Sequence, residues 1–169
     1  RVLAKKGVDS MLNLLYKLGY SWIARKKGRG ATRPYSTDGG KTMKKILIID
    51  DDLRHDKMMS YLLLSKGFDV IYALSGQEAL EKLRLKVFEK PDIILMDIMM
   101  PHMDGFETFK ETRKNPDLKD TPIIMLTALS DPQNMEKAIS IGAADYIEKP
   151  FSPSDVISRI KKVLEKGKK

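Results

Sequence analysis

The chain has 169 residues, of which 42% are hydrophobic and 32% are charged, and this mixture supports a globular core. It contains no cysteine, which excludes a disulfide scaffold, a thiolate metal site and a cysteine nucleophile. The formal net charge is +8, and such a basic balance makes nucleic acid or an anionic surface the first candidate partner.

The positive charge lies in the first 42 residues. That segment holds ten of the 31 Lys and Arg residues but only two of the 23 Asp and Glu residues, so its net charge is +8. Residues 43–169 carry 21 basic and 21 acidic residues and are neutral overall. We therefore predict two parts, a basic extension over residues 1–42 and a neutral domain over residues 43–169.

The basic extension combines a helical pattern with a linker. Apolar residues recur at helical spacing across residues 9–25, where Asp9 or Ser10 is a suitable N-cap. Residues 24–42 lack hydrophobic periodicity and contain four glycines and one proline, which is the composition of a linker. Two interpretations stay open. The extension binds nucleic acid or an anionic membrane, or it is a leader or a truncated piece of an upstream domain without a function of its own.

No apolar run reaches the roughly 20 residues that a membrane-spanning helix needs. Lys17 interrupts the apolar stretch at 11–16, and residues 25–27 are basic where a signal peptide would carry small residues. We therefore expect a cytoplasmic protein.

From residue 44 onward, short apolar segments alternate with amphipathic ones. The apolar segments, rich in Ile, Leu and Val, occupy residues 45–49, 69–73, 93–96, 122–126 and 144–147. The amphipathic stretches occupy residues 53–66, 76–88, 104–114, 132–141 and 153–166. Continuous apolar strands that alternate with helices are typical of a parallel sheet covered on both faces. We predict an α/β fold with a doubly wound, five-stranded parallel sheet, because five repeats are too few for an eight-fold barrel.

Polar side chains follow four of these predicted strands. They are Asp50, Asp51 and Asp52 after the first strand, Asp97 after the third, Thr127 after the fourth and Lys149 after the fifth. Because the carboxyl ends of parallel strands meet at one edge of a sheet, we expect these groups to converge there. Clustered carboxylates repel one another unless a cation neutralises them, and oxygen ligands without His or Cys select hard ions such as Mg²⁺ or Mn²⁺.

This set of groups is suited to phosphoryl transfer. Mg²⁺ that is held by one or two carboxylates normally also contacts a phosphate. A carboxylate can attack a phosphoryl group to give an acyl phosphate, and positioning and charge neutralisation supply most of the catalysis in such transfers. We expect Lys149 to neutralise charge on the phosphoryl oxygens and Thr127 to offer them a hydrogen bond.

Four motifs in the neutral domain carry a resemblance to a known family. They are ILIIDD at 46–51, Asp97 followed by MPHMDG at 100–105, TA at 127–128 and YIEKPF at 146–151. In this order, at the ends of the first, third, fourth and fifth predicted strands, they resemble the receiver domain of two-component response regulators. The resemblance covers residues 43–169 and implies a flavodoxin-like (βα)5 receiver fold of the CheY-like type.

The resemblance also implies the chemistry of the site. Asp97 would accept a phosphoryl group from a histidine of a sensor histidine kinase or of a phosphotransfer protein. Asp50, Asp51 and Asp97 would bind Mg²⁺ together with the backbone carbonyl of Met99. Such a domain catalyses its own phosphorylation and a slow loss of the phosphate, and it is not a conventional turnover enzyme.

By the same resemblance, further residues would transmit the phosphorylated state. Thr127 would be the switch hydroxyl and Tyr146 its aromatic partner, although a statically packed Tyr146 is the alternative. Lys149 would bind the phosphoryl group, and its peptide bond to Pro150 would be cis. Phosphorylation would then change the binding of a downstream effector on the face that the family forms from helix 4, strand 5 and helix 5.

Two alternative functions are a nucleic-acid-binding module and a hydrolase. A nucleic-acid-binding module, in which the basic extension contacts phosphates and the receiver regulates it, predicts steeply salt-dependent binding. A hydrolase with an aspartyl-phosphate intermediate would need a general acid near Asp97, and the apolar Met99 argues against one.

Met99 and Leu129, two residues after Asp97 and Thr127 respectively, cannot orient an attacking water. We therefore predict slow self-dephosphorylation.

Overall fold

The computed structural model describes residues 43–52, 59, 62–128 and 132–167. The chain divides between Met43 and Lys44, and the architecture below is that of the second unit, Lys44–Lys169. The basic extension, with the helix predicted at 9–25, lies outside the described residues. Within the described ranges, no helix has the length and apolar character needed to cross a membrane.

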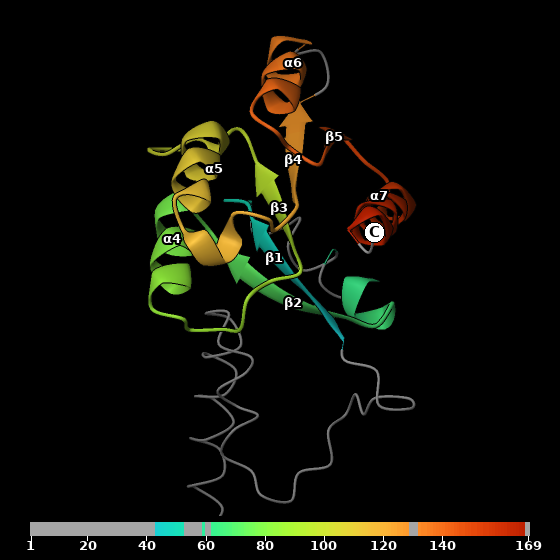
Figure 1. Ribbon diagram of the computed structural model, residues 1–169. Helices are drawn as coiled ribbons and strands as arrows, with labels where there is room; N and C mark the ends of the chain where they lie inside the picture. Colours follow the sequence, from blue (N-terminus) through green and yellow to red (C-terminus); the bar gives the residue numbers. More distant parts are fainter. Residues whose placement is uncertain (1–42, 53–58, 60–61, 129–131, 168–169) are drawn as a thin grey trace, which may run out of the picture. The chain divides into compact units, whose positions relative to one another are not determined.

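Five parallel strands form one sheet in the order β2–β1–β3–β4–β5 (Figure 1). Their bounds are Lys44–Ile49 for β1, Phe68–Ala73 for β2, Ile93–Asp97 for β3, Ile123–Ala128 for β4 and Asp145–Lys149 for β5. The predicted five-stranded parallel sheet is therefore confirmed. Its strand order, which hydrophobic periodicity does not specify, places β1 and β3 next to each other near the middle of the sheet.

Helices cover both faces of this sheet. Their bounds are Gly76–Arg84 for α4, Gly105–Arg113 for α5, Pro132–Ser140 for α6 and Pro153–Lys166 for α7, and the short 3₁₀ helix η2 spans Pro116–Leu118. Side chains of α4, α5 and α6 pack on one face, while α7 packs on the other together with the helical residues 62–65 (Figure 1). Of the helix predicted at 53–66, residues 53–58 and 60–61 lie outside the described residues.

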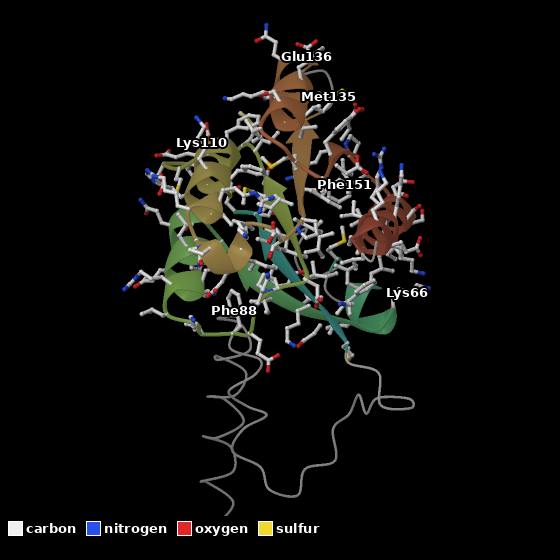
Figure 2. All side chains as sticks on the ribbon, viewed as in Figure 1. Lys66, Phe88, Lys110, Met135, Glu136 and Phe151 are labelled. Carbon is white, nitrogen blue, oxygen red and sulfur yellow. The ribbon has the colours of Figure 1, made fainter. Side chains whose placement is uncertain are left out.

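The inner strands β1, β3 and β4 contain continuous apolar runs because both of their faces are buried, whereas the edge strand β5 is only partly buried. In β1, Leu47 and Ile49 belong to the hydrophobic core under α4, α5 and α6, whereas Ile46 and Ile48 belong to the core under α7. Successive strand residues point to opposite faces, so every position of such a strand must be apolar. Charged side chains such as Lys110 on α5 and Glu136 on α6 extend from the outer faces of the helices (Figure 2).

Helix α4 ends four residues earlier than the predicted helix at 76–88. Lys86 adopts a left-handed conformation with φ of 50°. The N–H of Lys86 donates to Leu83 O at 3.2 Å, and that of Val87 donates to Lys82 O at 3.1 Å. These two bonds form a Schellman motif, which terminates a helix. The prediction was wrong here because glycine is the usual signal for that motif, and this sequence carries a lysine instead.

Candidate functional site

Asp50 and Asp97 lie at the carboxyl ends of neighbouring strands. Ile49 pairs with Met96 in the register of β1 and β3, so the residue that follows each one lies at the same level of the sheet. The N–H of Asp50 donates to Ala73 O at the end of β2, at 3.1 Å. Asp50 is 2% exposed and Asp97 is 5% exposed. The sheet thus brings two of the predicted site carboxylates together in a buried position.

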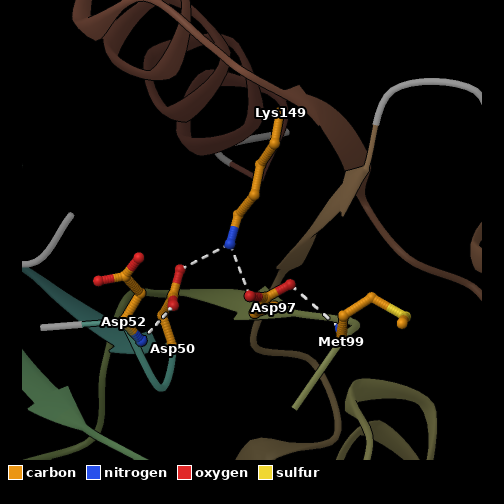
Figure 3. A network of polar contacts seen from close by, with 5 residues as sticks. All are labelled: Asp50, Asp52, Asp97, Met99 and Lys149. Atoms are coloured by element: carbon orange, nitrogen blue, oxygen red, sulfur yellow. Dashed lines mark hydrogen bonds and ion pairs between the residues drawn. The ribbon is translucent and has the colours of Figure 1, made fainter. Parts of the chain in front are cut away.

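Asp51 completes a cluster of three carboxylates. Ligand oxygens of Asp50, Asp51 and Asp97 all lie within 4.8 Å of one another. Asp51 is exposed, so the cluster can be reached from solvent. Asp52 contributes its backbone, because its N–H donates to Asp50 Oδ1 at 2.9 Å (Figure 3). Three carboxylates without a nitrogen or sulfur donor fit a hard divalent cation, and this donor set agrees with the predicted preference for such an ion.

Lys149 joins the two buried carboxylates. Its Nζ donates to Asp97 Oδ2 at 2.6 Å and to Asp50 Oδ2 at 2.9 Å (Figure 3). Lys149 ends β5, which is separated from β3 by β4, so the long side chain spans that distance. The peptide bond between Lys149 and Pro150 is cis. A buried carboxylate is costly unless a cation pairs with it, and Lys149 supplies such a cation to both Asp50 and Asp97.

Burial and the opposite charge of the partner shift the pKa values of Asp97 and Lys149. Burial raises the pKa of the Asp97 carboxyl above its ordinary value of 3.8, although the hydrogen bond from Lys149 opposes the rise. The neighbouring charge of Asp50 raises the same pKa further. Burial by itself lowers the pKa of Lys149, but the two carboxylates outweigh it and raise that pKa above 10.5. Lys149 therefore remains an ammonium at neutral pH.

Hydrogen bonds hold the loop between β3 and α5 to the side chain of Asp97 and to the carbonyl of Ile98. The N–H of Met99 donates to Asp97 Oδ1 at 3.1 Å. The carbonyl of Ile98 accepts the N–H of Met100 at 3.2 Å and that of Gly105 at 3.0 Å. A β-carbon on Gly105 would overlap the Asp97 carbonyl oxygen and lie 2.8 Å from the α-carbon of Ile98. Helix α5 can begin at this point only because residue 105 has no side chain.

Thr127 lies beside this cluster, in the strand between β3 and β5. It is 1% exposed, and its hydroxyl donates to Ala128 O at the long distance of 3.4 Å. Asp97 pairs with Leu126, so Thr127 is the next residue beyond the level of Asp97. No hydrogen bond joins the Thr127 hydroxyl to Asp97 or Lys149 in the part of the chain that the structure describes.

Tyr146 contacts α7 through its ring. The guanidinium of Arg159 lies 5.9 Å from the ring centroid and donates to Asp145 Oδ1 at 2.8 Å. Tyr146 is partly exposed, and its N–H donates to the same carboxylate oxygen at 2.9 Å. The sequence interpretation assigned no role to Arg159, since it is 14 residues from Asp145 and nothing local in the sequence signals the contact.

Gly105 is the second residue whose importance the sequence interpretation missed. It entered that interpretation only as part of the MPHMDG run. A usable signal was present, because Asp104 is the N-cap of α5 and Gly105 follows it directly after a strand and a short loop. Because Gly105 is the first residue of α5, the start of this helix packs directly against the backbone at the end of β3.

Solved structures of other proteins have the same fold. The chain superposes on the chemotaxis protein CheY4 of Vibrio cholerae with a TM-score of 0.67 and 34% identity, covering 72% of this chain and 99% of that one. It superposes on a CheY-like receiver domain protein of Methanospirillum hungatei with a TM-score of 0.68 and 30% identity, covering 75% and 98% of the two chains. Both neighbours are covered almost completely, so the predicted receiver fold is confirmed.

The chain belongs to the response regulator receiver domain family, whose profile matches residues 46–161. Among curated relatives, it is 40% identical over 124 residues to the alkaline phosphatase synthesis transcriptional regulatory protein PhoP of Bacillus subtilis. That match covers 73% of this chain and 50% of that protein. It is 40% identical over 129 residues to the probable transcriptional regulator ycf27 of Guillardia theta. That match covers 76% of this chain and 48% of that protein. The chain thus spans about half the length of the curated relatives it matches.

Proposed function

We propose that this receiver domain is a signalling switch that accepts a phosphoryl group on Asp97. The observation that carries this proposal is the buried carboxylate of Asp97, which lies 2.6 Å from Lys149 Nζ and within 4.8 Å of the two other carboxylates. Lys149 supplies a positive charge to Asp97 and Asp50, and the carboxylates of Asp50 and Asp51 next to Asp97 supply a cation site. The developing charge of a transferred phosphoryl group needs neutralisation of this kind.

The transfer consists of one displacement at phosphorus. A carboxylate oxygen of Asp97 bonds to the phosphorus of a phosphohistidine while the phosphorus–nitrogen bond breaks, and the imidazole leaves with the electron pair of that bond. Lys149 then exchanges part of its contact with the carboxylates for contact with a phosphoryl oxygen. The N–H of Met99, which already donates to Asp97 Oδ1, holds the carboxylate in one orientation during the attack.

We propose Mg²⁺ as the resident cation, with Mn²⁺ as an alternative. Asp50, Asp51 and Asp97 would hold it through carboxylate oxygens, and the backbone carbonyl of Met99 would be a fourth ligand. When bound, such a cation neutralises the carboxylates and the phosphoryl oxygens, which lowers the barrier to transfer. The three oxygen donors support a hard ion over zinc or copper.

The phosphorylated state would be read on the face made by α6, β5 and α7. We propose that the Thr127 hydroxyl hydrogen-bonds the phosphoryl group and that Tyr146 changes its packing in response. Tyr146 lines a surface pocket of about 260 Å³ formed by β5, the segment after it and α7, with lining residues that include Glu148, Phe151 and Arg159. A change at Tyr146 would therefore alter the shape of a surface that is open to a partner.

We propose two partners. The phosphoryl donor would be a sensor histidine kinase or a phosphotransfer protein, because the acceptor chemistry requires a phosphohistidine or an equally reactive donor. The receiving partner would be a downstream effector that binds the face of α6, β5 and α7. Two of the curated relatives are described as transcriptional regulators. This description supports the proposal that a longer protein containing such a receiver domain regulates transcription.

The direct test is phosphorylation of the full chain by acetyl phosphate with Mg²⁺, followed by peptide mass spectrometry. We expect one phosphoryl group on Asp97 and none in the Asp97→Asn variant. Beryllofluoride with Mg²⁺ offers a second readout, since it binds an acceptor carboxylate without hydrolysis. A chain that gains no adduct at Asp97 under either condition would overturn the proposal.

A second function rests on the charge of the basic extension. Residues 1–42 carry the entire net charge of +8, which favours binding of nucleic acid or of an anionic membrane. The test compares the full chain with residues 43–169 on DNA, RNA and anionic vesicles over a salt series. Steep salt dependence that disappears with the extension would support this function, and equal binding by both proteins would exclude it.

A further inference from the structure

The methionines of this protein differ sharply in their exposure. Met96 and Met125 are 0% exposed and Met100 is 7% exposed. Met43, Met59, Met103 and Met135 are partly buried, and Figure 2 shows Met135 on α6. Met99 is 67% exposed, which makes it the most accessible methionine among the residues that the structure describes.

Met99 is also the methionine that touches the site. Its N–H donates to Asp97 Oδ1 at 3.1 Å, so its α-carbon lies next to the carboxylate (Figure 3). A methionine side chain has three rotatable bonds and can adapt its position. Since Met99 is largely exposed, packing does not restrict the side chain to one rotamer. Its sulfur can therefore sample the space beside a group carried on Asp97.

We propose that Met99 is a site of oxidation by hydrogen peroxide and that its oxidation shortens the lifetime of the phosphoryl group on Asp97. This inference rests on the proposed function of Asp97. In the oxidation, a sulfur–oxygen bond forms and the peroxide oxygen–oxygen bond breaks. The thioether loses two electrons and becomes a sulfoxide, and the peroxide is reduced to water.

The effect follows from the change in polarity beside the acyl phosphate. A thioether is a poor hydrogen-bond acceptor, so the native Met99 neither binds nor orients a water molecule. A sulfoxide oxygen accepts hydrogen bonds and can hold a water molecule near the phosphorus of phosphorylated Asp97. Orientation of the attacking water accelerates hydrolysis. Oxidised protein would thus lose its phosphate sooner, and its signal would become sensitive to peroxide.

The first part of the test asks which methionine reacts. The folded full chain is treated with increasing hydrogen peroxide, and each methionine is followed by peptide mass spectrometry. We expect Met99 to oxidise before Met96, Met100 and Met125 in the folded protein, and all of them to oxidise at similar rates after unfolding. Oxidation of Met96 or Met125 at the rate of Met99 in the folded protein would overturn the proposal.

The second part measures the phosphate lifetime. Protein is phosphorylated with acetyl phosphate and Mg²⁺, freed of the donor, and followed by mass spectrometry as the phosphoryl group is lost. We expect peroxide treatment to shorten the half-life of wild type severalfold and methionine sulfoxide reductase to restore it. The matched variant Met99→Leu cannot form a sulfoxide, so its half-life is expected to be insensitive to peroxide. Met99→Gln, which places a carbonyl oxygen there permanently, is expected to lose phosphate quickly without oxidant.

The possible results distinguish failure of the Met99 proposal from failure of the proposed phosphorylation of Asp97. Absence of phosphate on Asp97 in untreated protein would overturn the proposed function and this inference together. A normal adduct whose half-life is the same in reduced and oxidised wild type would overturn this inference alone. A half-life that shortens equally in Met99→Leu would assign the effect to another residue and would also overturn it.

Discussion

The Lys149 ammonium nitrogen lies 2.6 Å from Asp97 Oδ2, although 52 residues separate the two in the chain. The same nitrogen lies 2.9 Å from Asp50 Oδ2. The lysine side chain is 21% exposed, and the two carboxylates are 8% and 3% exposed, so solvent screens these ion pairs only weakly. Removal of this one cation would leave two buried carboxylates facing each other.

We therefore expect Lys149→Met to impair both folding and phosphorylation. Loss of one partner of a buried ion pair costs about 3–5 kcal/mol of unfolding free energy. Denaturant unfolding with a chelator present would measure this loss. Loss of a group that neutralises transition-state charge is expected to slow phosphorylation by acetyl phosphate about 100- to 1,000-fold. The exposed Lys162 offers a matched control, because Lys162→Met removes the same charge away from the site. Phosphorylation of Lys149→Met at the wild-type rate would contradict the role assigned to Lys149.

The raised pKa of Asp97 predicts a pH dependence of stability in metal-free protein. The folded state binds the proton on the Asp97 carboxyl more tightly than the unfolded state does. The contribution of that proton to the unfolding free energy is therefore fully present below the ordinary pKa of 3.8. It is lost as the pH rises through the higher pKa of the folded state. At neutral pH the wild type therefore carries a buried carboxylate that costs stability.

Asp97→Asn removes that cost, so we expect this variant to gain stability relative to wild type as the pH rises above 3.8. The measurement is denaturant unfolding of both proteins across a pH series in the presence of a chelator. A difference in unfolding free energy that stays constant between acidic and neutral pH would show that Asp97 titrates with an ordinary pKa.

Divalent cations are expected to stabilise the folded chain through the carboxylate cluster. A ligand that binds only the folded state at 100 times its dissociation constant adds about 2.7 kcal/mol to the unfolding free energy. We expect Mg²⁺ to give a gain of this kind in wild type and little or none in Asp51→Asn. Asp51 is exposed, so its substitution leaves the buried ion pairs of Lys149 in place. Asp120→Asn, another exposed change, is the control that keeps the full gain.

The apolar residue beside the acceptor predicts a long phosphate lifetime. Met99 cannot hold an attacking water in its native form, so we expect the phosphoryl group on wild type to survive far longer than a few seconds in Mg²⁺. Met99→Asn introduces an amide that can orient water and is expected to shorten the half-life severalfold. Discharge is followed after removal of acetyl phosphate. A wild-type half-life of only seconds would show that another group already positions the water.

Gly105 is expected to be intolerant of a side chain. Gly105→Ala forces a β-carbon onto the backbone of Asp97 and Ile98, and overpacking of this kind costs about 1–3 kcal/mol. Gly167 is the control, since a β-carbon there meets no atom closer than 4.0 Å and its φ is −74°. Gly167→Ala is expected to change the unfolding free energy by less than about 0.5 kcal/mol. Equal effects of the two substitutions would show that the loop after β3 can move away from α5.

Local sequence was enough to predict which segments become strands and which residues end them. A strand that is buried on both faces must be apolar at every position, and Ile46 to Ile49 show that pattern without interruption. The first polar residue after such a run lies at the carboxyl edge of the sheet, which is how Asp50 was predicted to lie near Asp97. The end of α4 was harder to predict, because Lys86 adopts a conformation that its side chain does not favour.

The sequence by itself therefore determined the α/β class, the parallel sheet and the residue types at its carboxyl edge, because burial and backbone geometry act over short stretches of chain. The tertiary structure decided which of those residues meet. The strand order β2–β1–β3–β4–β5 places Asp50 beside Asp97, and in this arrangement Lys149 at the end of β5 reaches both carboxylates. The contact of Gly105 with the Asp97 backbone and that of Arg159 with Tyr146 arise in the same way. Such contacts join elements far apart in the chain, and no local pattern of residues encodes how those elements pack.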